Sequence, residues 1–267
     1  MTTTTEAYTL TRMTGVLGAR VDGLDLSRPL PEETVAALRD ALSEHCVLIF
    51  SGQGDLTAEQ QLAFGKYWGE LIAMPPDVDL VGGHAELFRI RTQPRDDDPH
   101  WHDDWHSDWT FLERPPFVSI LAAKKLPDAG GDTMWASQYA AYERLSPRLQ
   151  DIVNGLRAVH VRKKGGGVDK GVHPAVRTIP QTGRRALFVN EFYTTQFEGM
   201  TVEESAGLLG YLTKHATNPN FSFRHRWSPG DVAVWDNRCV QHYAVADYRE
   251  ERELHRLTIV GEIPEFR

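Results

Sequence analysis

The stretch Asp104-Trp105-His106-Ser107-Asp108-Trp109-Thr110-Phe111 carries metal-ligand side chains within a run of residues typical of a β-strand. Thr, Trp and Phe favour extended backbone, so we predict a strand or the mouth of a strand here. Side chains two residues apart on a strand point to the same side. His106 and Asp108 would therefore offer one imidazole and one carboxylate to a common point.

A third ligand is available far along the chain. The segment Trp235-Asp236-Asn237-Arg238-Cys239-Val240-Gln241-His242 predicts an apolar strand that ends in a turn, with His242 just beyond it. Two histidines and one carboxylate on one face of an ion leave its opposite face open. This ligand set is typical of non-haem Fe(II) oxygenases.

A lone His-x-Asp pair is more often a surface hydrogen bond than a metal site, and His102-Asp103-Asp104 repeats the pattern nearby. The motifs around the pair decide between these interpretations. They are Trp105-His106-Ser107-Asp108, Thr110-Phe111, Arg114-Pro115-Pro116, Gly130-Gly131-Asp132-Thr133 and the His242 segment with basic residues behind it.

In these motifs the sequence resembles the taurine and dichlorophenoxyacetate dioxygenase (TauD/TfdA) family of Fe(II)/α-ketoglutarate (2-oxoglutarate) enzymes. The resemblance runs from about Thr14 to Gly261. It implies that His106, Asp108 and His242 are the metal ligands and that His102 is not. Fe(II), α-ketoglutarate and O₂ are the implied cofactor and co-substrates.

The length of 267 residues fits one large β-rich domain as well as two small ones, and the resemblance implies a single domain over residues 1–267. Many short strands with a few helices suggest a closed double-sheet architecture. The resemblance sharpens this to a mainly β (α+β) fold: a clavaminate synthase-like double-stranded β-helix, or jelly roll, with flanking helices. Capping boxes at Thr57 and Thr201 each predict the start of a helix. The stretch near 160–173, mostly Lys and Gly, predicts a short flexible loop where the family has a longer lid.

The net charge of −8 argues against nucleic acid as a partner. The N-terminus lacks the features of a signal peptide, and no apolar run approaches the length of a membrane span. The cysteines, Cys46 and Cys239, suggest a reducing compartment, so we expect a cytoplasmic protein that does not bind membranes. Whether it forms a homo-oligomer stays open.

The far carboxylate of α-ketoglutarate needs a counter-charge, and arginine matches a carboxylate with two parallel hydrogen bonds. Arg252 and Arg256 lie four residues apart and would share one face of a strand. The resemblance places the α-ketoglutarate arginine at Arg252 and an arginine near the substrate anion at Arg256. It also implies that Thr133 hydrogen-bonds the co-substrate. The alternative interpretations are exposed arginines that balance nearby glutamates and a threonine that only stabilises its turn.

The remaining site residues also come from the resemblance. Asn190 and Tyr193 match positions near the substrate, although Tyr193 would serve equally well as a core residue. Met74 and His102 stand where taurine-specific members carry histidine and asparagine. Because these changes remove polar groups suited to a small sulfonate, we expect a bulkier or more apolar acid.

The resemblance therefore implies a dioxygenase that hydroxylates a C–H bond of a small or medium organic acid and releases succinate and CO₂. Sulfonates, alkyl sulfates and aryloxyalkanoates are the expected substrate classes. Two alternatives remain open at this stage. One is desaturation, epoxidation or ring oxidation of a natural-product intermediate, and the other is a non-catalytic binding protein.

Overall fold

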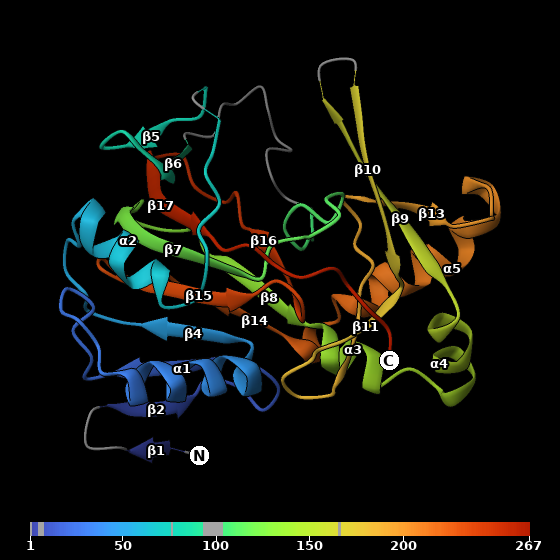
Figure 1. Ribbon diagram of the computed structural model, residues 1–267, viewed down its shortest axis with the longest axis horizontal. Coiled ribbons are helices and arrows are strands. Elements are labelled where there is room, and N and C mark those ends of the chain that lie inside the picture. Colours follow the sequence, from blue (N-terminus) through green and yellow to red (C-terminus); the bar gives the residue numbers. More distant parts are fainter. Residues whose placement is uncertain (1, 5–7, 76, 93–103, 165–166) are drawn as a thin grey trace.

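A nine-stranded sheet organises the protein, with strand order β1-β2-β3-β4-β15-β7-β17-β6-β5. The computed structural model describes residues 2–4, 8–75, 77–92, 104–164 and 167–267 (Figure 1). A three-stranded sheet of order β14-β8-β16 packs against it, and two small sheets, β10-β9-β13 and β11-β12, complete the fold. The result is a mixed α+β fold made mostly of strands, as the sequence predicts.

The strands of the large sheet are β1 (Thr2–Thr4), β2 (Thr9–Arg12), β3 (Ala19–Asp22), β4 (Val47–Phe50), β5 (Leu80–Val81), β6 (His84–Thr92), β7 (Val118–Lys125), β15 (Val232–Asp236) and β17 (Arg252–Thr258). The smaller sheets contain β8 (Thr133–Ser137), β9 (Arg157–Lys164), β10 (Gly167–Pro174), β11 (Val176–Thr178), β12 (Arg185–Leu187), β13 (Thr194–Phe197), β14 (Ser222–His225) and β16 (Val240–Ala244). The helices are α1 (Glu32–His45), α2 (Ala58–Lys66), α3 (Gln138–Glu143), α4 (Pro147–Asn154), α5 (Val202–Ala216) and the 3₁₀ helix η1 (Pro219–Phe221).

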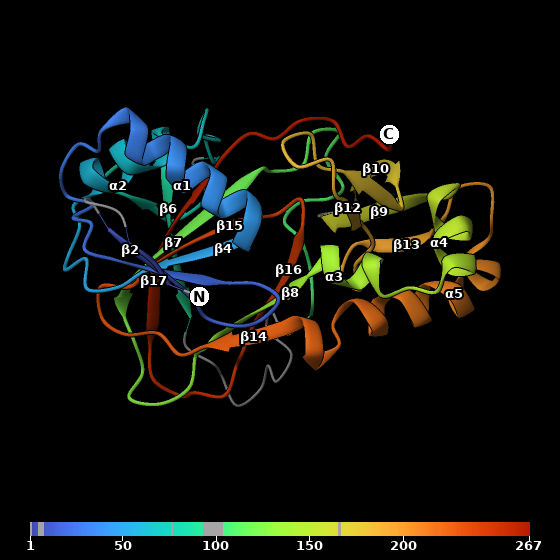
Figure 2. The ribbon, with the colours of Figure 1, turned by 90° about the horizontal axis from the view of Figure 1, so that it is seen from below.

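The two faces of the large sheet contact different layers because side chains alternate along each strand. On β7, Val118, Ile120 and Ala122 belong to the core cluster that contains the apolar residues of α1 and α2. Leu121 and Ala123 point the other way, into the cluster shared with the β14-β8-β16 sheet. Figure 2 shows α1 and α2 on one side of the large sheet, with α4 and α5 at the far end of the molecule.

The predicted capping boxes are confirmed. The side chains of Thr57 and Thr201 each accept a hydrogen bond from the third helical residue, and the side-chain oxygens of Gln60 and Glu204 accept one from the backbone N–H of the cap residue. These exchanges satisfy N–H groups that the first helical turn leaves without partners. Among the described residues, no helix has both the length and the apolar character that a membrane span requires.

The predicted strand at 104–111 is wrong. His106 forms only an isolated antiparallel bridge, with His242, and the chain then turns through residues 108–111. Trp109 takes a left-handed backbone conformation with φ 43°. The position of His242 also differs from the prediction, because His242 lies in the middle of β16, after the turn that follows β15.

The segment near 160–173 is not a loop. β9 and β10 pair antiparallel over most of it and form a hairpin that projects from the body of the protein (Figure 1). At its base, His160 and His173 are buried, with ring centroids 5.5 Å apart. Both rings also lie against Phe188. Whether this hairpin covers the active site as a lid stays a prediction.

Burial at the hairpin base makes both histidines hard to protonate. Burial lowers the pKa of His160 to about 3 and that of His173 to about 4, against about 6.5 for an ordinary histidine. Within the described chain, His160 Nε2 has no hydrogen-bond partner. Both imidazoles are therefore neutral in the folded protein near neutral pH.

We expect the free energy of unfolding to fall as the pH drops from 7 to 5. The unfolded chain takes up protons below about pH 6.5, whereas the folded protein does so only near its lowered pKa values, so acid favours unfolding. Each histidine contributes roughly 2 kcal/mol to this loss at pH 5. Urea unfolding at the two pH values measures it. His160→Gln should lose less stability between them than the original protein, and an identical loss would contradict this account.

Candidate metal centre and co-substrate site

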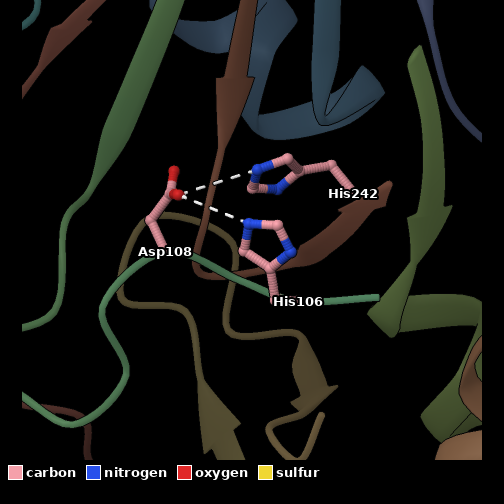
Figure 3. A group of neighbouring side chains, drawn as sticks. All are labelled: His106, Asp108 and His242. Carbon is pink, nitrogen blue, oxygen red and sulfur yellow. Dashed lines mark ion pairs between the residues drawn. The ribbon is translucent and has the colours of Figure 1, made fainter. Parts of the chain in front are cut away.

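His106, Asp108 and His242 come together as the sequence predicts (Figure 3). Asp108 Oδ1 lies 3.9 Å from His106 Nε2 and 3.6 Å from His242 Nε2. One ligand atom from each residue lies within 4.8 Å of the other two. A divalent cation between these atoms would be within ligand distance of all three after small adjustments.

Backbone pairing sets the two histidines side by side. His106 N donates to His242 O at 3.1 Å, and His242 N donates to His106 O at 2.7 Å. In such a hydrogen-bonded antiparallel pair the two side chains lie on the same side of the backbone, and the two ring centroids are 4.2 Å apart. The turn after His106 then brings Asp108 to the same point. The common direction of His106 and Asp108 therefore comes from a bridge and a turn, not from strand alternation.

The protonation states suit metal binding. Burial lowers the pKa of His106 and of His242, so both imidazoles are neutral. His106 Nδ1 lies 2.8 Å from the carbonyl oxygen of Asp104, which can only accept a hydrogen bond, so Nδ1 carries the proton and Nε2 is free to bind a metal. Burial by itself would raise the pKa of Asp108, but Arg256 and the two histidines hold it below its usual range.

The second oxygen of Asp108 is held from behind. Ser119 Oγ donates to Asp108 Oδ2 at 2.7 Å, and Arg256 forms an ion pair with the same oxygen. Ser119 Oγ in turn accepts from Asn237 Nδ2 at 2.9 Å and from Arg256 Nη2 at 3.0 Å. Asn237 Oδ1 accepts from Trp235 Nε1 at 2.9 Å. These contacts leave Oδ1 facing the histidines and fix the carboxylate, as partners of metal ligands commonly do.

A second polar group surrounds Arg252, which is buried. Its Nη2 donates to Thr133 Oγ1 at 3.3 Å, and Trp227 Nε1 donates to the same oxygen at 3.0 Å. Since both neighbours donate to Thr133, the hydroxyl hydrogen of Thr133 stays available for an acceptor. Among the described residues, Arg252 Nε has no hydrogen-bond partner. The guanidinium and this hydroxyl can together bind a carboxylate.

Gly131 makes room for this arginine. A Cβ at Gly131 would lie 3.0 Å from Cδ and 3.3 Å from Nε of Arg252, and Gly131 has φ 69°. A larger residue would be strained and would crowd the guanidinium. The Gly-Gly turn before Thr133 therefore belongs to the site as well as to the fold.

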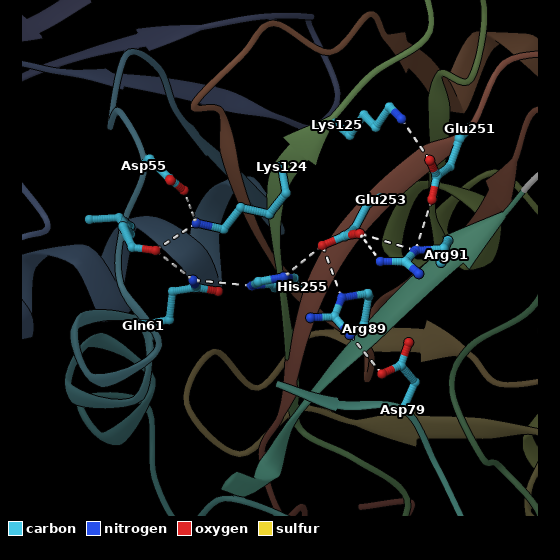
Figure 4. Close-up of polar contacts among 11 residues, drawn as sticks. Asp55, Gln61, Asp79, Arg89, Arg91, Lys124, Lys125, Glu251, Glu253 and His255 are labelled. Carbon is cyan, nitrogen blue, oxygen red and sulfur yellow. Dashed lines mark hydrogen bonds and ion pairs between the residues drawn. The ribbon is translucent and has the colours of Figure 1, made fainter. Parts of the chain in front are cut away.

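The outer face of β17 holds the strand in place (Figure 4). The Glu253 carboxylate accepts from Arg89 Nε at 2.9 Å, from Arg91 Nη2 at 2.9 Å and from His255 Nε2 at 3.1 Å. His255 Nδ1 lies 3.4 Å from Gln61 Nε2 on α2. Arg252 and Arg256 point from the opposite face into the interior, so these contacts help to fix the strand that carries both arginines.

The residues predicted to lie near the substrate differ in how close they are to the three metal-ligand candidates. Tyr193 is buried, and its ring centroid lies 6.3 Å from that of His106. Asn190 Nδ2 donates to Thr110 Oγ1 at 3.2 Å, in the turn at residues 108–111. Met74 is partly buried and its N–H donates to Ala85 O, and among the described residues no hydrogen bond links it to the three metal-ligand candidates. His102 lies outside the described residues.

Four residues at the site were not predicted from the sequence: Ser119, Asn237, Trp227 and Phe192, whose ring centroid lies 5.6 Å from that of His106. A signal existed for Ser119, a polar residue in the otherwise apolar run from Phe117 to Ala123. Asn237 also follows an apolar strand directly. No pattern in the sequence connects Trp227 with Thr133, because the two meet only where β14 pairs with β8.

We expect Ser119→Ala to weaken metal binding by about tenfold, since loss of a residue that holds a metal ligand typically costs 10- to 100-fold. Mn(II) titration followed by electron paramagnetic resonance measures this without turnover. Ser205→Ala, which removes another buried serine hydroxyl far along the chain, is the matched control and should leave Mn(II) affinity unchanged. Equal affinities in both variants would show that Ser119 does not hold Asp108.

Comparisons with known proteins agree with this geometry. The family model for "Taurine catabolism dioxygenase TauD, TfdA family" matches residues 8–258. An alpha-ketoglutarate-dependent sulfate ester dioxygenase of Pseudomonas putida is 35% identical over 94% of this chain and 88% of its own. An alpha-ketoglutarate-dependent 2,4-dichlorophenoxyacetate dioxygenase of Cupriavidus pinatubonensis is 33% identical over 92% of this chain and 96% of its own.

A solved structure extends the likeness to three dimensions. The crystal structure of a taurine dioxygenase from Burkholderia xenovorans is 38% identical, has a TM-score of 0.88, and covers 97% of this chain and 91% of its own. The matching folds, the family model and the His-Asp-His group lead to one conclusion. The chain belongs to the TauD/TfdA family and is an α-ketoglutarate-dependent dioxygenase.

Proposed function

We propose that this enzyme uses Fe(II), α-ketoglutarate and O₂ to hydroxylate a C–H bond of a small or medium organic acid. One observation carries the proposal: two neutral histidines and one ionised aspartate converge in the protein interior. Neutral imidazoles and a carboxylate are the ligands that non-haem Fe(II) takes in oxygenases. The bound metal would supply the chemistry that couples oxidation of the keto acid to oxidation of the substrate.

The chain's own residues position the co-substrate. In the proposal, the Arg252 guanidinium pairs with the far carboxylate of α-ketoglutarate, and the Thr133 hydroxyl donates to it. Burial of Arg252 strengthens this pairing because water competes less for the charged groups. The products are succinate, CO₂ and the oxidised acid.

The substrate class is inferred from relatives. The named activities of the similar enzymes concern sulfate esters and 2,4-dichlorophenoxyacetate, both of which combine an anionic group with an apolar part. We propose a sulfonate, alkyl sulfate or aryloxyalkanoate for this enzyme. Arg256, Asn190, Tyr193, Met74 and His102 are proposed neighbours of this substrate.

Arg256 has a second role to reconcile with that assignment. Its Nη2 lies against Asp108 and Ser119, so one end of the guanidinium is already engaged. Its Nε has no hydrogen-bond partner within the described residues. A substrate anion would therefore approach the Nε side, and Arg256 would link the substrate to the metal carboxylate.

The wider architecture completes the proposal. We propose that the large sheet and the facing β14-β8-β16 sheet form a double-stranded β-helix within a single domain over residues 1–267. The β9–β10 hairpin would act as the lid. Two free buried cysteines, Cys46 and Cys239, are compatible with a cytoplasmic location.

A substrate panel tests the proposed function. Purified enzyme with Fe(II), α-ketoglutarate and O₂ should form succinate faster when one class of sulfonate, alkyl sulfate or aryloxyalkanoate is added, together with an oxidised product of that acid. His242→Ala should abolish this stimulation because the metal would lose one of its three protein ligands. If none of these acids stimulates succinate formation, the proposed substrate class is wrong.

Arg252→Gln should raise the KM for α-ketoglutarate by at least about tenfold. A charge-assisted hydrogen-bonded pair contributes roughly 1.5–3 kcal/mol, which corresponds to about ten- to over a hundredfold in binding. The KM of Arg252→Lys should lie between those of the wild-type enzyme and Arg252→Gln, because lysine keeps the charge but cannot donate two parallel hydrogen bonds. An unchanged KM in both variants would assign the co-substrate carboxylate to another residue.

A further inference from the structure

Phe192 is an apolar side chain exposed next to a metal ligand. It is 47% exposed, yet its ring centroid lies 5.6 Å from that of His106 and 4.6 Å from that of Tyr193. Tyr193 continues the aromatic group to Phe111, with ring centroids 5.2 Å apart. Single exposed hydrophobic residues are common on protein surfaces, so exposure alone carries no argument. The argument rests instead on the position of Phe192 beside His106.

Of the three metal-ligand candidates, His106 has the most exposed side chain. The side chain of His106 is 17% exposed, whereas those of His242 and Asp108 are 8% and 3% exposed. Arg256 and Ser119 cover Asp108 from behind, and the ring of Trp235 lies 4.9 Å from that of His242. A molecule from solvent would reach the group past His106, where Phe192 lies.

The turn that carries Phe192 is held firmly. Asn190 Oδ1 accepts from Tyr193 N at 2.8 Å, and Thr194 Oγ1 accepts from Asn190 N at 2.9 Å. The Asn190 side chain also donates to Thr110, two residues after Asp108. Phe192 therefore lies on a turn that is hydrogen-bonded to the turn at residues 108–111, which contains Asp108. A rigid aromatic surface can bind a ligand at little entropic cost.

We infer that Phe192 determines substrate specificity by packing against the apolar alkyl or aryl part of the substrate. The inference rests on the proposed function and adds a residue to it. Covering the exposed part of one phenylalanine ring corresponds to about tenfold in affinity. The effect should depend on how much apolar surface the substrate has, because apolar burial scales with area.

Two alkyl sulfates that share an anion but differ in chain length, ethyl sulfate and hexyl sulfate, test the inference. Calorimetry without O₂, on enzyme loaded with Mn(II) and α-ketoglutarate, measures binding separately from turnover. Phe192→Ala should weaken hexyl sulfate binding by about tenfold and ethyl sulfate binding by less than about twofold. Phe192→Leu should retain most of the affinity for hexyl sulfate. Tyr211→Ala, which removes an aromatic ring 48% exposed on α5, is the matched control and should change neither.

The other outcomes separate the two proposals. Equal weakening of both sulfates would make Phe192 a support for His106, and no weakening would make it an ordinary surface residue; either result overturns the inference. If wild-type enzyme oxidises acids from the panel but gains no affinity with chain length, the inference fails while the proposed function stands. If no acid from the panel binds or is oxidised, the proposed function fails, and the inference fails with it.

Discussion

The rest of the site depends on how the Asp108 carboxylate is held. Oδ2 is bound by Ser119 and Arg256, while Oδ1 faces His106 and His242. Burying a carboxylate is costly unless it is paired and hydrogen-bonded. The arginine and the serine meet that requirement from one side, so the other side can remain open to a cation. The same contacts fix the direction in which the ligand oxygen points.

Strand β17 joins this centre to the proposed co-substrate position. Arg256 reaches Asp108, and Arg252, on the same face of the strand, reaches Thr133. The two arginines are four residue steps apart along the strand, which corresponds to roughly 13 Å. The other face of β17 is tied to β6 and α2 through Glu253 and His255, so a displacement of the strand would move both arginines together. We see in this arrangement a physical reason for both arginines to lie on one strand.

Much of the fold was predictable where the signal is local. Capping boxes at Thr57 and Thr201 depend on residues three apart, and their helices begin as predicted. Ser146 and Pro147 at the start of α4 are another local signal, because the serine caps the helix and proline suits its first turn. At the β9–β10 hairpin the local composition gave a wrong prediction, because its lysines and glycines suggested a loop. Cross-strand pairing and the burial of His160 and His173 at the base stabilise strands there, and neither can be seen in a single stretch of sequence.

The sequence by itself determined the proposed ligand set: His106, Asp108 and His242 are residue types suited to one ion, and the resemblance of the flanking motifs favoured them over His102. It also determined that Arg252 and Arg256 share a face, because strand alternation is a local rule. Only the tertiary structure decided how these groups meet. The His106–His242 bridge, the Ser119–Asn237 contacts behind Asp108 and the exposure of Phe192 join residues far apart in the chain. Such contacts depend on which strands and turns pack together, and no periodicity along the chain encodes that choice.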